Sequence, residues 1–275
     1  MTFHLSSCLM FTALATLAAC GSSGGGGGGG DGDGDGTSDA VLSDIEGTTV
    51  TSSAAGFQVG SGASISNATI TVDSGFFDGD LDGTLEIFGE TITITDGVGA
   101  LNTGEEVRLT YETNRAGIYA APIDATISSR NDINGETAFV VGAETSTSSV
   151  NAVTGTLTYV GDFQAIGSLN GANAQTEYEG GITVVVDFAS DDADFTLDGV
   201  LDGATDVDLE GTGLDVAGNG ISGDLDCAVG CSDSSSEVDA TFYGPDANEL
   251  GGVLLVDIAV DGDAYDGVGT FVIAP

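Results

Sequence analysis

Apolar and polar residues alternate along most of the second half of the chain, with the period of two that is typical of half-buried β-strands. Acidic residues fill the alternate positions around Val207 and Leu209. Clusters of Gly, Asp and Asn separate these segments and favour turns. The pattern predicts eight strands, at residues 156–165, 181–189, 194–201, 205–211, 220–228, 237–244, 250–260 and 264–274.

Eight consecutive strands with short connections favour an antiparallel up-and-down barrel, because closing the sheet removes its exposed edges. A transmembrane barrel would crowd the acidic residues into a narrow lumen. We therefore predict a soluble eight-stranded barrel domain at residues 152–275. Glycines inside the predicted strands weaken regular pairing but permit the bends of a small barrel; they are Gly161, Gly199, Gly211, Gly223 and Gly269.

The first half of the chain has a less regular β pattern between residues 40 and 151. Val, Ile, Thr, Phe and Tyr recur there between turn-forming residues, and this composition favours strands. We predict a second β-rich domain of about six strands, which makes the whole protein all-β. Its short apolar runs lie at residues 70–72, 85–87, 92–94, 107–111 and 139–141.

The N-terminus has the features of an export signal. An apolar run at residues 8–17 is too short to span a membrane and precedes Leu17-Ala18-Ala19-Cys20-Gly21. This stretch resembles the lipobox of bacterial lipoproteins. The resemblance implies a signal peptide at residues 1–19, acylation of Cys20 and a stable lipid anchor in the membrane. The alternative is an ordinary signal peptide with an incidental cysteine.

Residues 20–39 are rich in Gly and Asp, a composition that is typical of a flexible tether. Asp31, Asp33 and Asp35 have the spacing of the first ligands of an EF-hand calcium loop. The twelfth position of such a loop would be Leu42, where a bidentate Glu is required. We therefore interpret this segment as a solvated linker.

The charge balance excludes one class of partner and leaves two explanations open. The chain has 44 acidic residues against three arginines and no lysine, giving a net charge of −41. Such a chain repels nucleic acids and anionic lipid headgroups. The acidity either maintains solubility in a salty medium, where ions screen the repulsion, or attracts a basic partner or Ca²⁺.

The residue types needed for most catalytic sites are missing from the predicted mature chain. The one histidine, His4, lies in the signal, and there is no lysine. Ser-His-Asp and Cys-His arrangements and zinc sites with imidazole ligands are thereby excluded. Facing carboxylates are expected by chance among so many acids, so they do not mark a glycosidase. We expect no enzymatic activity and no cofactor.

Haem is also not expected as a ligand. Haem iron takes an axial His, Met, Cys or Tyr. Both methionines, Met1 and Met10, lie in the signal, and the predicted barrel has no Arg or Lys to pair with the propionates.

Cys227 and Cys231 lie close together at the end of a predicted strand. In an exported protein this spacing predicts a disulfide that closes a small loop. The alternative is a reactive dithiol, but no cationic neighbour in the sequence would lower a thiol pKa.

Three barrel segments resemble the C-terminal β-barrel domain of transferrin-binding protein B and related surface lipoproteins. They are residues 154–163 (TGTLTYVGDF), 181–189 (GITVVVDFA) and 240–253 (ATFYGPDANELGGV). The third segment follows the family pattern Phe-Tyr-Gly-Pro-x-Ala-x-Glu-x-Gly-Gly. The residues of this motif are Phe242, Tyr243, Gly244, Pro245, Asp246, Ala247, Glu249, Gly251 and Gly252.

We interpret this motif as structural. Pro245 presets the φ of a turn, Asp246 tolerates the next position, and Gly251 and Gly252 let the returning strand begin bent. We expect Phe242 to be buried and Tyr243 to point outward.

The resemblance implies that residues 40–151 correspond, by position, to the family's handle domain. It also implies a protein of the outer membrane, displayed on the cell surface, that binds an external protein or solute without catalysis. A TonB-dependent receptor and an outer-membrane lipoprotein-export barrel are the partners implied beside the membrane itself. The alternative is an acidic structural or adhesive protein that binds Ca²⁺ collectively.

Overall fold

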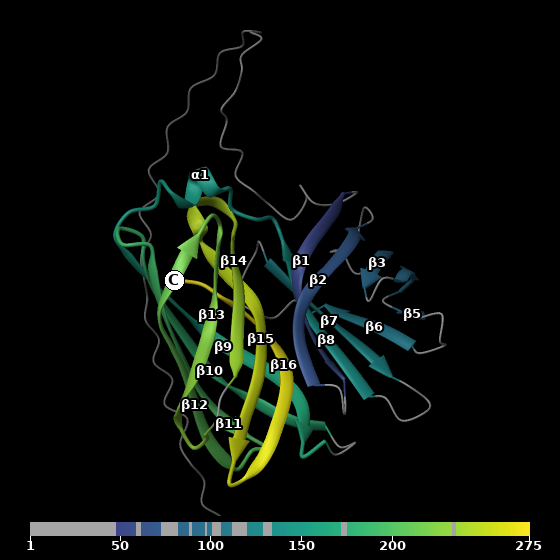
Figure 1. Ribbon diagram of the computed structural model, residues 1–275. Helices are drawn as coiled ribbons and strands as arrows, with labels where there is room; N and C mark the ends of the chain where they lie inside the picture. Colours follow the sequence, from purple (N-terminus) through teal and green to yellow (C-terminus); the bar gives the residue numbers. More distant parts are fainter. Residues whose placement is uncertain are drawn as a thin grey trace, which may run out of the picture. The chain divides into compact units, whose positions relative to one another are not determined.

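The computed structural model describes residues 48–58, 62–72, 82–87, 90–96, 98–100, 106–111, 120–128, 134–171, 175–232 and 235–275. Most of these residues lie in antiparallel strands, which form an eight-stranded sheet and a closed eight-stranded barrel (Figure 1). Helix in this part of the chain is limited to α1 (Thr147–Val150) and the 3-10 turn η3 (Pro245–Ala247). The predicted all-β fold class is confirmed.

The C-terminal strands form the predicted up-and-down barrel. Each strand pairs with the next along the chain, and the last strand returns to pair with the first, from Tyr265 opposite Leu169 to Phe271 opposite Phe163. All eight predicted strands are present. They are β9 (Thr156–Leu169), β10 (Gln175–Asp187), β11 (Asp192–Leu201), β12 (Thr205–Ala217), β13 (Gly220–Val229), β14 (Ser236–Tyr243), β15 (Glu249–Val260) and β16 (Asp263–Ile273).

Aromatic and aliphatic side chains fill the barrel interior. The ring of Phe163 meets the edge of Tyr178 with centroids 4.8 Å apart, and Phe195 meets Phe271 at 6.2 Å. Val, Leu and Ile residues of the alternating pattern complete this core. The interior is therefore a packed core rather than a cup for a ligand.

Three tyrosines bring polar hydroxyls into this core. Tyr159 donates a hydrogen bond to the carbonyl of Ala247 at 2.7 Å, and Tyr178 donates to that of Val207 at 3.0 Å. Tyr265 donates to the carbonyl of a buried threonine at 3.3 Å. Burial raises the pKa of the Tyr159 and Tyr178 hydroxyls, so both remain neutral donors. Each buried hydroxyl thus has a partner.

Glycines make room for the interior rings. A Cβ atom at Gly199 would lie 2.5 Å from Cε2 of Tyr178 and 2.7 Å from Cζ of Phe163. A Cβ atom at Gly267 would likewise overlap the ring of Tyr265. Gly199, which we predicted as a bend point, and Gly267, which we did not, therefore leave the space that the neighbouring rings occupy.

The N-terminal strands form a sheet of eight strands, so the prediction of about six strands was wrong. The strands are β1 (Thr49–Gln58), β2 (Gly62–Val72), β3 (Gly83–Ile87), β4 (Glu90–Ile94), β5 (Val98–Ala100), β6 (Glu106–Tyr111), β7 (Ala120–Ser128) and β8 (Asn134–Gly142). The apolar runs located β2, β3, β4, β6 and β8. They missed β1 and β7, which are rich in Ser, Thr and Ala, and β5, which has three residues.

The chain folds back on itself within this sheet. The strand order is β4-β3-β2-β1-β8-β7-β6-β5, so the first and last strands pair at its centre. Strands β4 and β5 lie at the two edges and are joined by a turn with reciprocal backbone hydrogen bonds between Thr95 and Val98.

The described residues between 48 and 275 belong to one compact unit, and apolar side chains on the outer side of β15 and β16 contribute to its packing. Val253 and Val268 pack there against Ala55 of β1 and Ala138 of β8. Both faces of these two barrel strands are consequently buried. The proposed border between a 40–151 domain and a 152–275 domain stays a prediction.

The packing at Gly199 can be tested by substitution. We expect Gly199→Val to lower the free energy of unfolding by about 1–3 kcal/mol, because the new side chain would force the rings of Tyr178 and Phe163 from their positions. The matched control is Gly181→Val in β10, where a Cβ atom would have no neighbour within 4 Å. Urea unfolding of both variants measures the difference, and equal stability would contradict this packing.

Candidate functional site

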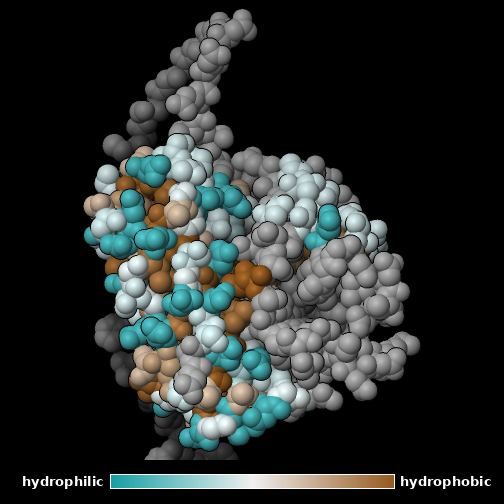
Figure 2. Space-filling model, in the orientation of Figure 1, coloured by the Kyte–Doolittle hydropathy of each residue, from teal (hydrophilic) through white to brown (hydrophobic). Residues whose placement is uncertain are grey.

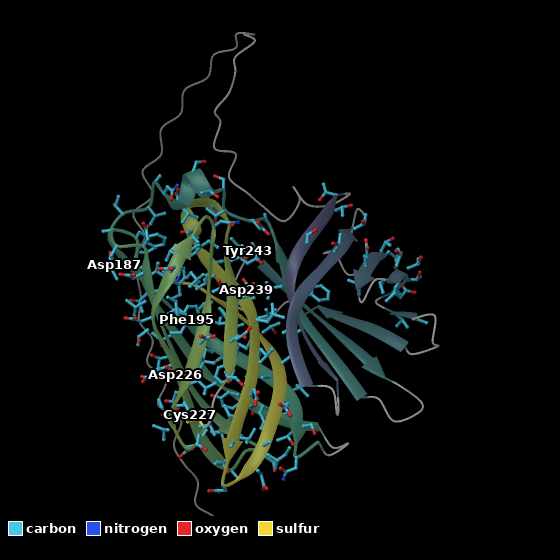
Figure 3. The ribbon with its side chains drawn as sticks, in the orientation of Figure 1. Asp187, Phe195, Asp226, Cys227, Asp239 and Tyr243 are labelled. Carbon is cyan, nitrogen blue, oxygen red and sulfur yellow. A yellow bond between two sulfur atoms is a disulfide. The ribbon has the colours of Figure 1, made fainter. Side chains whose placement is uncertain are left out.

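Because side chains fill the barrel, the surfaces available for recognition lie on its outside. Outward positions of β10–β13 carry a set of carboxylates that we call the acidic wall. In Figure 3, Asp187 and Asp226 point away from the barrel while Phe195 points into it. The members of the acidic wall are Glu177, Glu179, Asp187, Asp192, Asp194, Asp198, Asp206, Asp208, Glu210, Asp215, Asp224 and Asp226.

The acidic wall places like charges directly opposite one another. Asp198 faces Asp208, and Glu210 faces Asp226. Residues 152–275 contain 24 acidic residues and no Lys, Arg or His, so no basic side chain of the barrel relieves this repulsion. Burial, with the charges of Asp198 and Asp206, raises the pKa of Asp208. Figure 2 shows hydrophilic residues over much of the barrel face in view.

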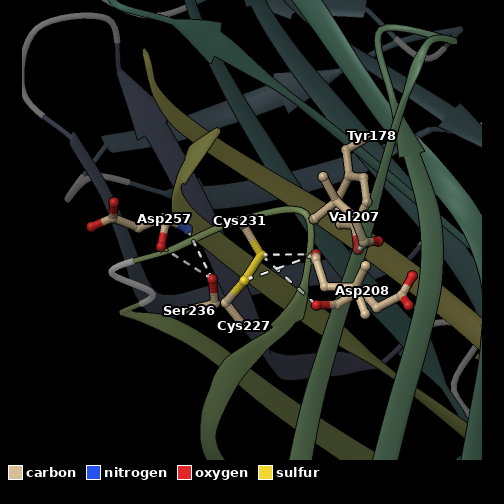
Figure 4. Close-up of a disulfide and its surroundings, with 8 residues drawn as sticks. Tyr178, Val207, Asp208, Cys227, Cys231, Ser236 and Asp257 are labelled. Carbon is tan, nitrogen blue, oxygen red and sulfur yellow. Dashed lines mark hydrogen bonds between the residues drawn. A yellow bond between two sulfur atoms is a disulfide. The ribbon is translucent and has the colours of Figure 1, made fainter. Parts of the chain in front are cut away.

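A second pair of carboxylates lies on the outer side of β15 and β16. Asp257 faces Asp266 across the two strands. The hydroxyl of Ser235 donates to the carboxylate of Asp257 at 2.7 Å. The hydroxyl of Ser236 accepts from the backbone N–H of Asp257 at 3.0 Å (Figure 4). Partial burial and the neighbouring Asp257 raise the pKa of Asp266. Hydrogen bonds therefore satisfy one member of the pair.

A disulfide joins Cys227 and Cys231 at the end of β13 (Figure 4). Both residues pack against the barrel core, and the sulfur of Cys231 lies 3.8 Å from the carbonyl oxygen of Asp208. Between them Gly230 has φ +73°, and a Cβ atom there would overlap the carbonyl of Asp206. The bond that we predicted thus holds a tight loop against β12 and the acidic wall.

The family motif lies where the sheet meets the barrel. Phe242 points into the core, with its ring 5.6 Å from that of Phe188. Tyr243 points outward as predicted, yet it is only 2% exposed because Val140 of β8 and Val272 of β16 cover it. Its hydroxyl donates to the carbonyl of Val140 at 3.3 Å. The predicted direction was right, and the sheet explains the burial.

The turn of the motif attaches to the segment that follows β8. Gly244 has φ +74°, and its N–H donates to the carbonyl of Ala143. The hydroxyl of Thr145 donates to the carbonyl of Gly244 at 2.6 Å. Asp246 has φ +57°, which Asp tolerates, and Ala247 shares this left-handed conformation at +56°. These contacts support the structural interpretation of the motif.

Close backbone packing explains the two glycines of the motif at the start of β15. Gly251 lies beside the junction, where a Cβ atom would approach Val140 and Tyr243 to 3.1 and 3.2 Å. A Cβ atom at Gly252 would overlap the carbonyl of Asp239 on β14. Glu249 is buried at the start of β15.

A cap closes the barrel at the same end. Ser146 is the N-cap of α1, where its side chain accepts from the N–H of Ser149. Val150 of α1 and Ala247 of η3 are both buried in the barrel core.

Several predicted features lie outside the described residues. These are Cys20, the 20–39 tether with Asp31, Asp33 and Asp35, and the signal with His4. Within the part of the chain that is described, no group of three or more His, Cys, Asp or Glu side chains is arranged to hold a metal ion. No helix in that part has the length and apolar character needed to cross a membrane.

Sequence reasoning missed the buried outer side of β15 and β16. The sequence contained the evidence, because residues 250–256 (LGGVLLV) have no polar side chain on either face of the strand. A strand that is apolar on both faces is buried on both faces. We predicted the strand correctly but did not infer that a second sheet covers it.

Comparison with known proteins finds a family model that matches the barrel. Residues 152–272 match the family model of the C-lobe and N-lobe β-barrels of transferrin-binding protein B. Among curated proteins, none matches the chain by sequence.

Two solved structures share the fold. Intact transferrin-binding protein B, with its N and C lobes, aligns with a TM-score of 0.51 and 18% identity, over 81% of this chain and 46% of that one. A double mutant of the same protein from Haemophilus parasuis aligns with a TM-score of 0.51 and 20% identity, over 80% and 44%.

This chain therefore spans less than half the length of those proteins. The match covers the barrel at residues 152–272, which is similar to the β-barrels that build the lobes of transferrin-binding protein B.

Proposed function

We propose that the chain is a lipid-anchored protein of the outer membrane surface that binds an external protein or solute without catalysis. The observation that supports this proposal is the barrel itself, which matches the barrels of transferrin-binding protein B and has a core filled by aromatic and aliphatic side chains. A ligand would then bind to the outer faces and the loops. A TonB-dependent receptor and a lipoprotein-export barrel are proposed as companions in the membrane.

The charge of the acidic wall favours a partner with a basic face. A surface of one sign steers oppositely charged molecules toward it and speeds their association. Binding would also relieve the repulsion between the carboxylates that face one another, such as Asp198 and Asp208. The solved relatives are named for binding transferrin, so iron-loaded transferrin is the first candidate to test.

A second candidate function is collective binding of Ca²⁺ by a structural or adhesive protein. The same facing carboxylates support it, because a divalent cation would neutralise two of them at once. The two functions differ in their dependence on Ca²⁺. A protein partner would bind in the presence of a chelator, whereas collective Ca²⁺ binding would be lost.

The repulsion within the acidic wall predicts an unusual pH dependence. Since the pKa of Asp208 is raised in the folded state, its ionisation opposes folding, and this cost disappears as the pH falls from neutral toward the ordinary Asp value of 3.8. We expect Asp208→Asn to raise the free energy of unfolding at pH 7 by about 0.2–1 kcal/mol, the range for facing like charges. Thermal unfolding between pH 7 and pH 4 measures the effect.

The control is Asp202→Asn, which removes the same charge from the turn between β11 and β12. We expect it to gain less stability at pH 7 than Asp208→Asn. If both variants gained stability equally, net charge rather than the facing pair would be the cause.

Lipid attachment is tested at Cys20. We expect Cys20→Ser to abolish palmitate labelling, to leave an uncleaved precursor and to lose membrane attachment, because acylation would require the thiol. Globomycin should produce the same precursor from the wild-type chain. Palmitate uptake by the Cys20→Ser chain, with unchanged fractionation, would show that the lipobox interpretation is wrong.

The binding function is tested on the purified full chain with iron-loaded transferrin. We expect saturable binding in the presence of a chelator, with a dissociation constant that rises at least tenfold between low and high salt because charges drive association. The double variant Asp198→Asn/Asp208→Asn should weaken it at low salt. No saturable binding, together with a large chelator-sensitive stabilisation by Ca²⁺, would favour the structural alternative.

A further inference from the structure

Strands β13 and β14 separate before β13 ends. Among the described residues, their pairing begins with Gly220 opposite Thr241 and stops with Leu225 opposite Ser236. Strand β13 continues beyond that point to Val229. The barrel wall therefore lacks a regular backbone ladder between these two strands at one end.

The two sides of this separation follow different neighbours. Cys227 remains paired with β12, opposite Leu209. Ser232 instead pairs with Ala259 of β15, through reciprocal backbone hydrogen bonds of 2.8 and 2.9 Å. We call this divergence of the chain from β12 toward β15 the fork.

The disulfide crosses the fork. Cys227 lies on the side that follows β12, and Cys231 directly precedes Ser232 on the side that follows β15, with 5.7 Å between the two cysteine Cα atoms. Both cysteines are half-buried and pack against the barrel core. The covalent bond thus joins the two sides where, among the described residues, the pairing of β13 with β14 has ended.

The pairing of β13 with β12 is also incomplete. On β12 the paired positions jump from Glu210 to Val216. Leu214 approaches β13 within this interval, and a Cβ atom at Gly223 would lie 2.7 Å from its Cδ2 atom. Beyond the interval, the end of β13 is paired with β12 at residues 208–210 alone. Few backbone hydrogen bonds would have to break for that end to come away.

The start of β13 is fixed at the opposite end of the barrel. The side chain of Asn219 donates to the carboxylate of Glu144 at 2.9 Å. In Figure 3, Cys227 lies far from Tyr243, which marks the end where the sheet joins the barrel. An opening at the fork would therefore leave the capped end of the barrel intact.

Carboxylates around the fork determine which thiols react with the disulfide. Asp226 precedes Cys227, and Asp208 and Glu210 flank the residue of β12 that faces it. At the spacings of a β-sheet these charges lie within about one Debye length of the sulfurs, roughly 8–10 Å. A thiol attacks as its thiolate, so a thiol that carries a further negative charge is repelled. A cationic thiol is therefore the favoured reductant.

We propose that the Cys227–Cys231 disulfide is a redox-sensitive latch on the end of β13. The thiolate of a cationic thiol attacks one sulfur to form a mixed disulfide, and a second thiol molecule then releases the cysteine. The two cysteines gain two electrons and two protons, and the two thiol molecules leave as one disulfide. Residues 226–232 then separate from β12 and β15 and uncover one end of the core, while the rest of the barrel stays folded.

Hydrogen exchange of the purified full chain, with and without cysteamine, tests the latch. Alkylation and intact mass establish that both cysteines are reduced. We expect the backbone amides of Ser232 and Ala259 to exchange roughly 10- to 30-fold faster in the reduced chain, the range for releasing a loop of this length. The amides of β9 and β10, which lie away from the fork, should keep their rates. Removal of cysteamine and reoxidation should restore slow exchange.

The matched control is Cys227→Ser/Cys231→Ser, which keeps Cys8 and Cys20. Its Ser232 and Ala259 amides should exchange fast whether cysteamine is present or not. The anionic thiol 3-mercaptopropionate should reduce the wild-type bond roughly fivefold more slowly than cysteamine at equal thiolate concentration, because the carboxylates repel it.

Three results would overturn the proposal. The first is unchanged exchange at Ser232 and Ala259 after both cysteines are reduced. The second is equal acceleration of all barrel amides, which would make the bond a support of the whole fold rather than a latch. The third is a bond that cysteamine reduces only in the unfolded chain. Equal rates with the two thiols would contradict the role given to the carboxylates.

Discussion

Burial of the outer side of β15 and β16 is the contact on which the rest of the structure depends. Val253 and Val268 meet Ala55 and Ala138 of the sheet, and Tyr243 is enclosed between Val140 and Val272. Fully burying one valine contributes about 1.5–3 kcal/mol, so these few side chains represent a substantial part of a typical folding free energy. Without this contact two barrel strands would expose an apolar surface, and the sheet would lose its support.

Different outer faces of the chain carry different kinds of side chain. Apolar outward positions on β15 and β16 pack against the sheet, and carboxylates on β10–β13 face solvent. The filled core and the disulfide hold the barrel rigid beneath these surfaces. Because the barrel interior is filled, the exterior is the surface that such a protein offers to a ligand.

Much of the barrel was predictable because apolar and polar residues alternate along its strands. This alternation located β9–β16, and the motif around Pro245 indicated the resemblance to the barrels of transferrin-binding protein B from the sequence alone. The sheet was harder, since β1 (TVTSSAAGFQ) has few large apolar residues, and its pairing with β8 joins segments about 80 residues apart. Long-range pairing, unlike alternation, leaves little trace in one sequence.

Native-state hydrogen exchange of the full chain tests the central claim, that sheet and barrel form one cooperative body. The account predicts that the slowest amides of β1 and β8, near Ala55 and Val140, open with the same free energy as those of β15 and β16. It also predicts that all four strands respond alike to low concentrations of denaturant. If β1 and β8 opened several kcal/mol below the barrel, the buried face would not unite the two assemblies, and the claim would be wrong.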